Sequence, residues 1–297
     1  MKNLLAVLLI VSLASCRKKE DDSTPDQNTT STSQLIFRFH FDSTQARLNN
    51  FGAVTGVPAG HGSLSPHFNL MSAHYIELAQ DSFTLLGNGA VVYRAPEVNN
   101  GGLAIDFDQA VLAADGGIFF SIPLSQVAAG TYKWLRVSLA YQNYDISYRY
   151  YYNTVPYDAQ GTIASFIGFN TYIHNYTIKD STIAVNANKL QGFWGFETTN
   201  FSITTVSQGQ APPGATTVPN PLAFTSPVPA GSCVVTGKFD SPLIISSSGS
   251  TDKTVTVSVS TNHSFEWVEH SNPLYFEPLD GDTVIDMGVR GIEPHVQ

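Results

Sequence analysis

The chain has 297 residues, of which 42% are hydrophobic and 13% are charged, and its formal net charge at pH 7 is −9. This acidic balance argues against a nucleic-acid partner, because phosphate binding requires clustered lysine and arginine side chains. Phenylalanine (18 residues), tyrosine (13), glycine (23) and proline (16) are plentiful. Such a composition is typical of β-strands joined by turns.

The N-terminal segment has the features of a secretory signal peptide. Lys2 precedes an apolar run from Leu4 to Leu13, which is shorter than the roughly 20 residues that span a bilayer. We therefore expect a signal peptide over residues 1–15. The letters LASC at its end resemble the lipobox of bacterial lipoproteins, and this resemblance implies that Cys16 carries lipid after cleavage. The alternative is an ordinary signal peptide followed by a chance cysteine.

Residues 16–34 are expected to be a lipidated cysteine followed by a disordered tether. The stretch RKKEDDSTPDQNTTSTSQ contains no large apolar residue, so it cannot bury enough surface to fold. Position 17 is arginine rather than aspartate. The resemblance to lipoproteins of double-membraned bacteria therefore implies the outer membrane, on its periplasmic face or at the cell surface. The one remaining cysteine, Cys233, is expected to be buried as a small hydrophobic residue.

Alternating apolar and polar residues predict strands along most of the remaining chain. The clearest runs are LIFRFHFD (35–42), GTYKWLRVSLAYQ (130–142), TDKTVTVSVSTNHSFEW (251–267) and TVIDMGVRGI (283–292). Turn sequences such as NNGG, ADGG and LDGD separate them, and these favour hairpins. We expect an all-β, antiparallel β-sandwich with long loops and little helix, as a single domain over residues 35–297.

The alternation also predicts which side chains face the core, with Leu35 nearer the edge. The expected buried residues are Phe37, Phe39, Phe41, Trp134, Val255, Val257 and Val259.

Two segments depart from the strand pattern. DFDQAVLAAD (106–115) indicates one short helix or turn, capped by Asp106 or Asp108. The segment 208–232 contains six prolines and interrupts the alternation. We interpret it as a surface excursion of the single domain. The alternative is a boundary before a C-terminal group of strands.

Catalytic signatures are missing from the sequence. It contains no Gly-x-Ser-x-Gly, no Walker loop and no His-Glu-x-x-His. A pair of glycosidase carboxylates needs no local motif, so a carbohydrate-active or ester-cleaving enzyme stays as the least favoured reading. We predict a protein that is not an enzyme.

Four of the eight histidines fall between residues 40 and 74. Imidazole nitrogens bind copper and zinc well. His40 shares a polar strand face with Asp42, and His61 and His67 lie in a stretch rich in glycine, serine and proline that can fold over a sheet edge. These three are the candidate metal ligands. His74 has the parity of Ile76 and is expected to face the core. The alternative for all of them is an ordinary structural role.

Four segments occur in an order that resembles MbnP-like copper-binding lipoproteins. They are LIFRFHFDS, FNLMSAHYIELAQDSFTLL, VAAGTYKWLRVSLAY and KTVTVSVSTNHSFEW. The resemblance implies a β-sandwich and copper, as the cofactor, held by histidines. Only His40 sits in a matching strand, so the other ligands are not carried over.

Clustered aromatic residues suggest a second kind of function. YQNYDISYRYYYNTVPYD (141–158) holds seven tyrosines, and QGFWGFE (191–197) places three aromatic rings between glycines. These rings could contact a sugar or a protein partner, or they could pack in the core. If residues 150–152 form a strand, at least one of their three tyrosines must point outward.

The sequence therefore predicts a lipid-anchored extracytoplasmic binding protein, bound to the membrane through Cys16. In the sharper form of this prediction, the protein holds copper through clustered histidines. The alternative is a metal-free interaction or ligand-capture module that uses an aromatic surface and works with an outer-membrane protein partner. The ligand-binding residues of such a module are not specified by any motif.

Overall fold

The computed structural model describes residues 32–49, 52–211, 227–229, 231–246, 249–270 and 274–297. The predicted signal peptide, Cys16 and most of the predicted tether lie outside the described residues, as do 212–226 and 230 of the proline-rich segment. Residues Thr32–Gln297 form one compact unit. Among these described residues, strands make up 61% and no helix reaches seven residues, which confirms the all-β sandwich prediction.

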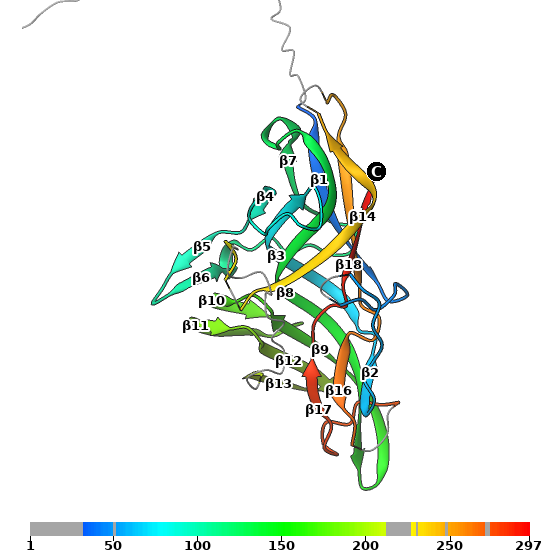
Figure 1. Ribbon diagram of the computed structural model, residues 1–297. Helices are drawn as coiled ribbons and strands as arrows, with labels where there is room; N and C mark the ends of the chain where they lie inside the picture. Colours follow the sequence, from blue (N-terminus) through cyan, green and yellow to red (C-terminus); the bar gives the residue numbers. More distant parts are fainter. Residues whose placement is uncertain (1–31, 50–51, 212–226, 230, 247–248, 271–273) are drawn as a thin grey trace, which may run out of the picture. The chain divides into compact units, whose positions relative to one another are not determined.

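The largest sheet has seven strands, in the order β13-β12-β9-β8-β3-β4 with β14 also paired to β8 (Figure 1). All pairings in it are antiparallel. Its strands are β3 (His67–Ala79), β4 (Ala90–Arg94), β8 (Gly130–Tyr152), β9 (Val155–Phe166), β12 (Phe193–Asn200), β13 (Ile203–Gln210) and β14 (Cys233–Ile245). The long β8 pairs with β14 along its first part and with β9 along its last part, so it connects the two ends of the sheet.

A four-stranded sheet in the order β18-β15-β1-β7 covers part of the large sheet. It consists of β1 (Gln34–Asp42), β7 (Ile118–Pro123), β15 (Lys253–Ser260) and β18 (Ile292–Val296). Although most pairings in the protein are antiparallel, β1 and β15 run parallel. Apolar side chains of β1 and β15 pack with those of β3, β8 and β14 in the main core.

Burial in this core follows the predicted alternation with three exceptions. Phe37 and Phe39 are buried, as are the three valines of β15. Leu35 is also fully buried rather than near an edge, because β1 is flanked by β15 and β7 from its first residues. Phe41, at the end of β1, is only half-buried. Trp134 is half-buried too, although Tyr132 on the same face of β8 and Leu135 on the opposite face both lie in the main core.

Two smaller sheets complete the fold. One has the order β17-β16-β2 and contains β2 (His61–Leu64), β16 (Phe265–Val268) and β17 (Thr283–Asp286). The other has the order β11-β10-β6-β5 and contains β5 (Glu97–Asn99), β6 (Leu103–Asp106), β10 (Asn170–Thr177) and β11 (Thr182–Leu190). Within this second sheet β6 and β10 run parallel.

Helical structure is limited to two 3₁₀ turns, η1 (Phe107–Gln109) and η2 (Leu124–Gln126), within the described residues. Asp106 caps η1 by accepting a hydrogen bond from the backbone N–H of Asp108, so the turn predicted at 106–115 forms with the first of its two candidate caps. No helix in the described ranges is long and apolar enough to cross a membrane. Cys233 is buried and free, and this burial raises the pKa of its thiol to about 12.

Candidate functional site

The three candidate metal ligands lie on three different strands. His40, on β1, is exposed, and its Nδ1 lies 3.0 Å from Oδ1 of Asp115. His61, on β2, places Nδ1 2.6 Å from Oε1 of Glu266. His67 is exposed at the first position of β3. Across the described part of the chain, no group of three or more His, Cys, Asp or Glu side chains could hold a metal ion. The structure therefore does not gather His40, His61 and His67 into a copper site.

His74 is fully buried, as expected from the sequence. Its Nε2 lies 2.9 Å from Oε1 of Glu97, and its ring centroid lies 5.3 Å from that of Phe169. Burial lowers the pKa of His74 despite the opposing effect of Glu97. The side chain is therefore held neutral as part of the core.

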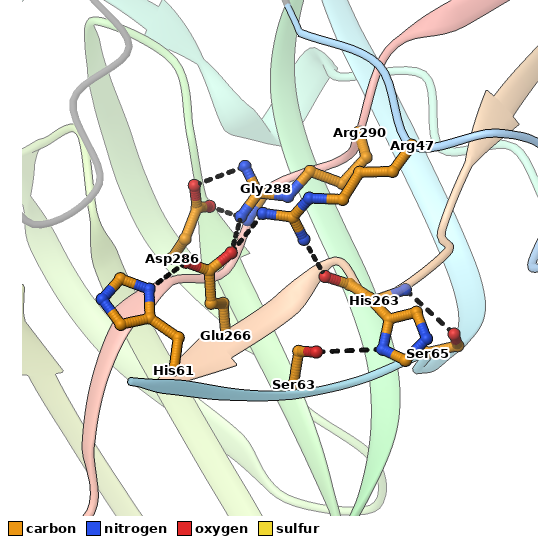
Figure 2. Close-up of polar contacts among 9 residues, drawn as sticks. All are labelled: Arg47, His61, Ser63, Ser65, His263, Glu266, Asp286, Gly288 and Arg290. Carbon is orange, nitrogen blue, oxygen red and sulfur yellow. Dashed lines mark hydrogen bonds and ion pairs between the residues drawn. The ribbon is translucent and has the colours of Figure 1, made fainter. Parts of the chain in front are cut away.

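A buried network of charged side chains surrounds Glu266 (Figure 2). Glu266 lies on β16 with only 4% of its side chain exposed, and it pairs with Arg47, Arg290 and His61. Arg290 also pairs with Asp286 of β17 at 2.7 Å. Burial alone would raise the pKa of Glu266, but hydrogen bonds from His61 and Arg47 and the charge of Arg290 outweigh it and lower that pKa. The carboxylate is therefore ionised.

This network joins segments that are far apart in the sequence. Arg47 also donates to the backbone oxygen of His263, and the Nδ1 atom of His263 lies 2.9 Å from the Ser63 hydroxyl (Figure 2). The backbone N–H of His263 donates to the Ser65 hydroxyl. These contacts connect the loop that contains Arg47, between β1 and β2, with the strands β2 and β16. We interpret the network as structural, because each charged side chain in it forms an ion pair with another member of the network.

The opposite face of this small sheet borders a cavity. Glu266 is paired with Ser63, while its neighbour Phe265 is paired with Leu64. Side chains alternate between the two faces of a strand, so Phe265 points away from the charged network. Its ring lies 6.4 Å from that of Tyr144 on β8, which places it against the large sheet.

The cavity lies between the large sheet and the β16–β17 side of the small sheet, and its volume is about 350 Å³. Its walls are mainly aromatic and aliphatic. The lining residues are Ile146, Tyr148, Ile163, Trp194, Phe196, Ser207, Gln210, Ala211, Phe265, Phe276, Pro278, Val284 and Met287. Typical small-molecule sites have volumes of roughly 300–1,000 Å³ and similarly apolar walls. We select this cavity as the candidate site, because its volume lies in that range and its walls are mainly apolar.

The aromatic wall on β12 is built by alternation and by small neighbours. Trp194 and Phe196 are two residues apart and share one face of the strand. Gly161, on β9, lies below the Phe196 ring, and Gly209, on β13, lies below the Trp194 ring. A Cβ atom at either glycine would overlap the ring above it. The two glycines therefore let the rings lie flat over the neighbouring strands.

The inner wall is held by the core. The Phe265 and Phe276 rings meet edge to face, with centroids 5.1 Å apart. The backbone oxygen of Met287 accepts hydrogen bonds from the Gln142 amide and, at 3.3 Å, from the Tyr144 hydroxyl. Phe265, Phe276 and Met287 are all buried, so this side of the cavity is fixed and apolar.

The exposed polar lining residues of the cavity lie on its β13 side. Ser207 and Gln210 belong to β13 and are exposed, and this strand ends the large sheet. The Gln210 amide nitrogen donates to the Gln191 backbone oxygen at 2.7 Å. The Tyr148 hydroxyl is already bonded, to Thr198 at 3.0 Å and Asn200 at 2.8 Å.

A line of aromatic rings leads from the cavity to the exposed ends of the β8–β9 and β12–β13 hairpins. Tyr148 contacts Phe196 and Tyr150, Tyr150 stacks on Tyr157, and Tyr157 contacts Phe201, with centroid separations of 5.7–6.1 Å. Phe201 is 77% exposed. Tyr151 and Tyr152 are exposed as well, which confirms that at least one ring of residues 150–152 points outward.

Sequence reasoning found part of this site. Tyr148, Trp194 and Phe196 lie in the two aromatic segments singled out above. Phe276, Val284 and Met287 were missed. The alternation around residue 265 indicates a buried face, but no local signal shows what that face meets.

The fold and the cavity together define an all-β domain with an apolar, aromatic-lined site between two of its sheets. Comparison of the chain with models of protein families, with curated proteins and with solved structures finds no match.

Proposed function

We propose that this protein is a lipid-anchored extracytoplasmic binding module that captures a small apolar molecule in the cavity between β12 and β16. The observation that carries the proposal is the cavity itself, a space of about 350 Å³ with aromatic and aliphatic walls. A ligand that removes apolar surface from water gains roughly 25 cal/mol for each Å². Rigid rings on sheet strands offer such surface in a preformed shape.

The chemistry of the walls favours binding over catalysis. Tyr148 is the one titratable side chain among the described lining residues, and its hydroxyl is bonded to Thr198 and Asn200. General acid–base catalysis needs a titratable group within reach of the substrate. The proposed function therefore includes no reaction, and it requires no metal.

The location is proposed from the sequence. The lipobox letters LASC at 13–16 support lipid attachment at Cys16, and Arg17 supports sorting to the outer membrane.

A second candidate function is a protein contact at the hairpin ends. The exposed rings of Tyr152 and Phe201, together with Ile203 at 69% exposure, favour it. Aromatic side chains are enriched in protein interfaces, and an outer-membrane protein is the partner we expect. This surface and the cavity can operate in the same molecule.

The cavity proposal is tested with N-phenyl-1-naphthylamine, an uncharged probe whose fluorescence rises in apolar surroundings. The protein beginning at Thr32 is suitable, because Thr32–Gln297 is one compact unit. Val284→Trp places a large ring in the cavity from β17. Val268→Trp is the matched control, since Val268 lies on the adjacent β16, is exposed and does not line the cavity.

We expect saturable probe binding that Val284→Trp weakens about tenfold or more and Val268→Trp leaves unchanged. Tenfold corresponds to about 1.4 kcal/mol, which is less than the loss of a well-filled apolar contact. Equal affinities for both variants, with both folded by circular dichroism, would exclude the cavity as the binding site.

A further inference from the structure

We infer that the molecule taken into the cavity is a neutral amphiphile, with an uncharged polar head at the β13 edge and an apolar chain against Phe265 and Met287. This inference rests on the proposed function and names the ligand class for the same site. It follows from three features of the cavity: the charge of its walls, the position of its polar groups and the gradient of burial across it.

The first feature is charge. The described lining residues include no Lys, Arg, His, Asp or Glu. A charged ligand group inside the cavity would lose water without gaining a partner, and burial of an unpaired charge is strongly unfavourable.

The nearest charged groups on the small sheet are already paired. Glu266 follows Phe265 in the chain but lies on the other face of β16, where it pairs with Arg47 and Arg290. Asp286 precedes Met287 and pairs with Arg290. Neither carboxylate is available to a cationic ligand, and neither arginine is available to an anionic one.

The second feature is the position of the polar groups. Ser207 and Gln210 are the exposed lining residues with polar side chains, and both come from β13. A hydroxyl group can donate and accept, and an amide can do both as well. They suit the hydroxyl, ester or amide of a neutral head group.

The third feature is burial, which gives the ligand a direction. Phe265, Phe276 and Met287 are buried, whereas Ser207 and Gln210 are exposed on an edge strand. An apolar chain gains most binding free energy where the walls of the cavity are buried from water. The chain therefore points inward, toward the β16–β17 side, and the head stays at the wet edge.

The test uses three ligands with the same ten-carbon chain: 1-decanol, decanoate and decylammonium. Each ligand is tested for its ability to displace N-phenyl-1-naphthylamine from the protein beginning at Thr32. The pH is near 8, and the ligand concentrations are below those at which micelles form. We expect 1-decanol to bind at least tenfold more tightly than either charged ligand. Equal or tighter binding of decanoate or decylammonium would overturn the inference.

The head position is tested with paired substitutions on one strand. Ser207→Ala with Gln210→Ala removes the polar groups at the cavity edge. Thr205→Ala with Gln208→Ala is the matched control, because these residues lie on β13 but do not line the cavity. We expect severalfold weaker 1-decanol binding for the first pair and unchanged binding for the control. Equal 1-decanol affinity in both pairs would contradict the assigned head position.

The two proposals fail in different ways. If the probe does not bind, or if Val284→Trp does not weaken it, the cavity is not a binding site and both proposals fall. If the probe binds in the cavity but a charged chain displaces it as well as 1-decanol does, the proposed function stands and only the inferred ligand class is wrong.

Discussion

Replacement of Glu266 by alanine should be among the most destabilising substitutions of a polar residue in this protein. The side chain is 4% exposed, and it is the shared partner of Arg47, Arg290 and His61. Loss of this carboxylate leaves Arg47, itself buried, without its charged partner, while Arg290 keeps Asp286. Breaking a buried ion pair by removing one partner costs about 3–5 kcal/mol.

The assay is equilibrium unfolding in urea, followed by tryptophan fluorescence. Glu266→Gln is a second variant that keeps the size of the side chain and removes its charge, and we expect a loss of similar size. Asp158→Ala is the control for an exposed pair: Asp158 binds Arg149 through two contacts of 2.6 and 2.9 Å, yet 63% of its side chain is exposed. Solvent screens such a pair, so its loss should change stability little.

Comparison of the unfolding midpoints of Glu266→Ala and Asp158→Ala tests whether the buried network contributes to stability. If Glu266→Ala and Asp158→Ala shift the unfolding midpoint by the same small amount, then the network around Glu266 does not hold the small sheet to the rest of the domain. A large loss for Glu266→Ala with almost none for Glu266→Gln would show that packing, rather than charge, is what the carboxylate contributes.

The other predictions concern the core, pH and the anchor. Phe39→Ala, at a site 1% exposed, should lower the free energy of unfolding by about 3–5 kcal/mol, whereas Phe201→Ala, at a site 77% exposed, should change it by less than about 0.5 kcal/mol in the same urea assay. Burial lowers the pKa of His74, so below about pH 6.5 the unfolded chain binds more protons at this residue and stability falls as pH falls. In His74→Phe, the urea unfolding midpoint should therefore change less between pH 7 and pH 5 than it does in the unsubstituted protein. The same pH dependence of the midpoint in both proteins would contradict this. Cys16→Ser should prevent lipid attachment and release the protein from the membrane fraction, and unchanged processing with normal fractionation would refute the lipobox assignment.

Local patterns in the sequence are sufficient to predict the strand content of this protein. Alternation of apolar and polar residues is a property of one strand by itself, because successive side chains point to opposite sides of the backbone. Phe37, Phe39 and the valines of β15 are buried as that alternation predicts. Alternation alone does not give the burial of Trp134, because it separates the two faces of a strand without saying what covers each of them.

The positions of the histidines and the walls of the cavity depend on tertiary structure. His61 meets Glu266 across 205 positions of the chain, and this contact engages Nδ1 of an imidazole that the sequence offered as a metal ligand. The cavity likewise combines Trp194 of β12 with Phe265 of β16. The sequence determined that these residues are aromatic and lie on strands. Strand order and register alone decided that they face one another, because such convergence depends on distant pairings that no local stretch of the chain records.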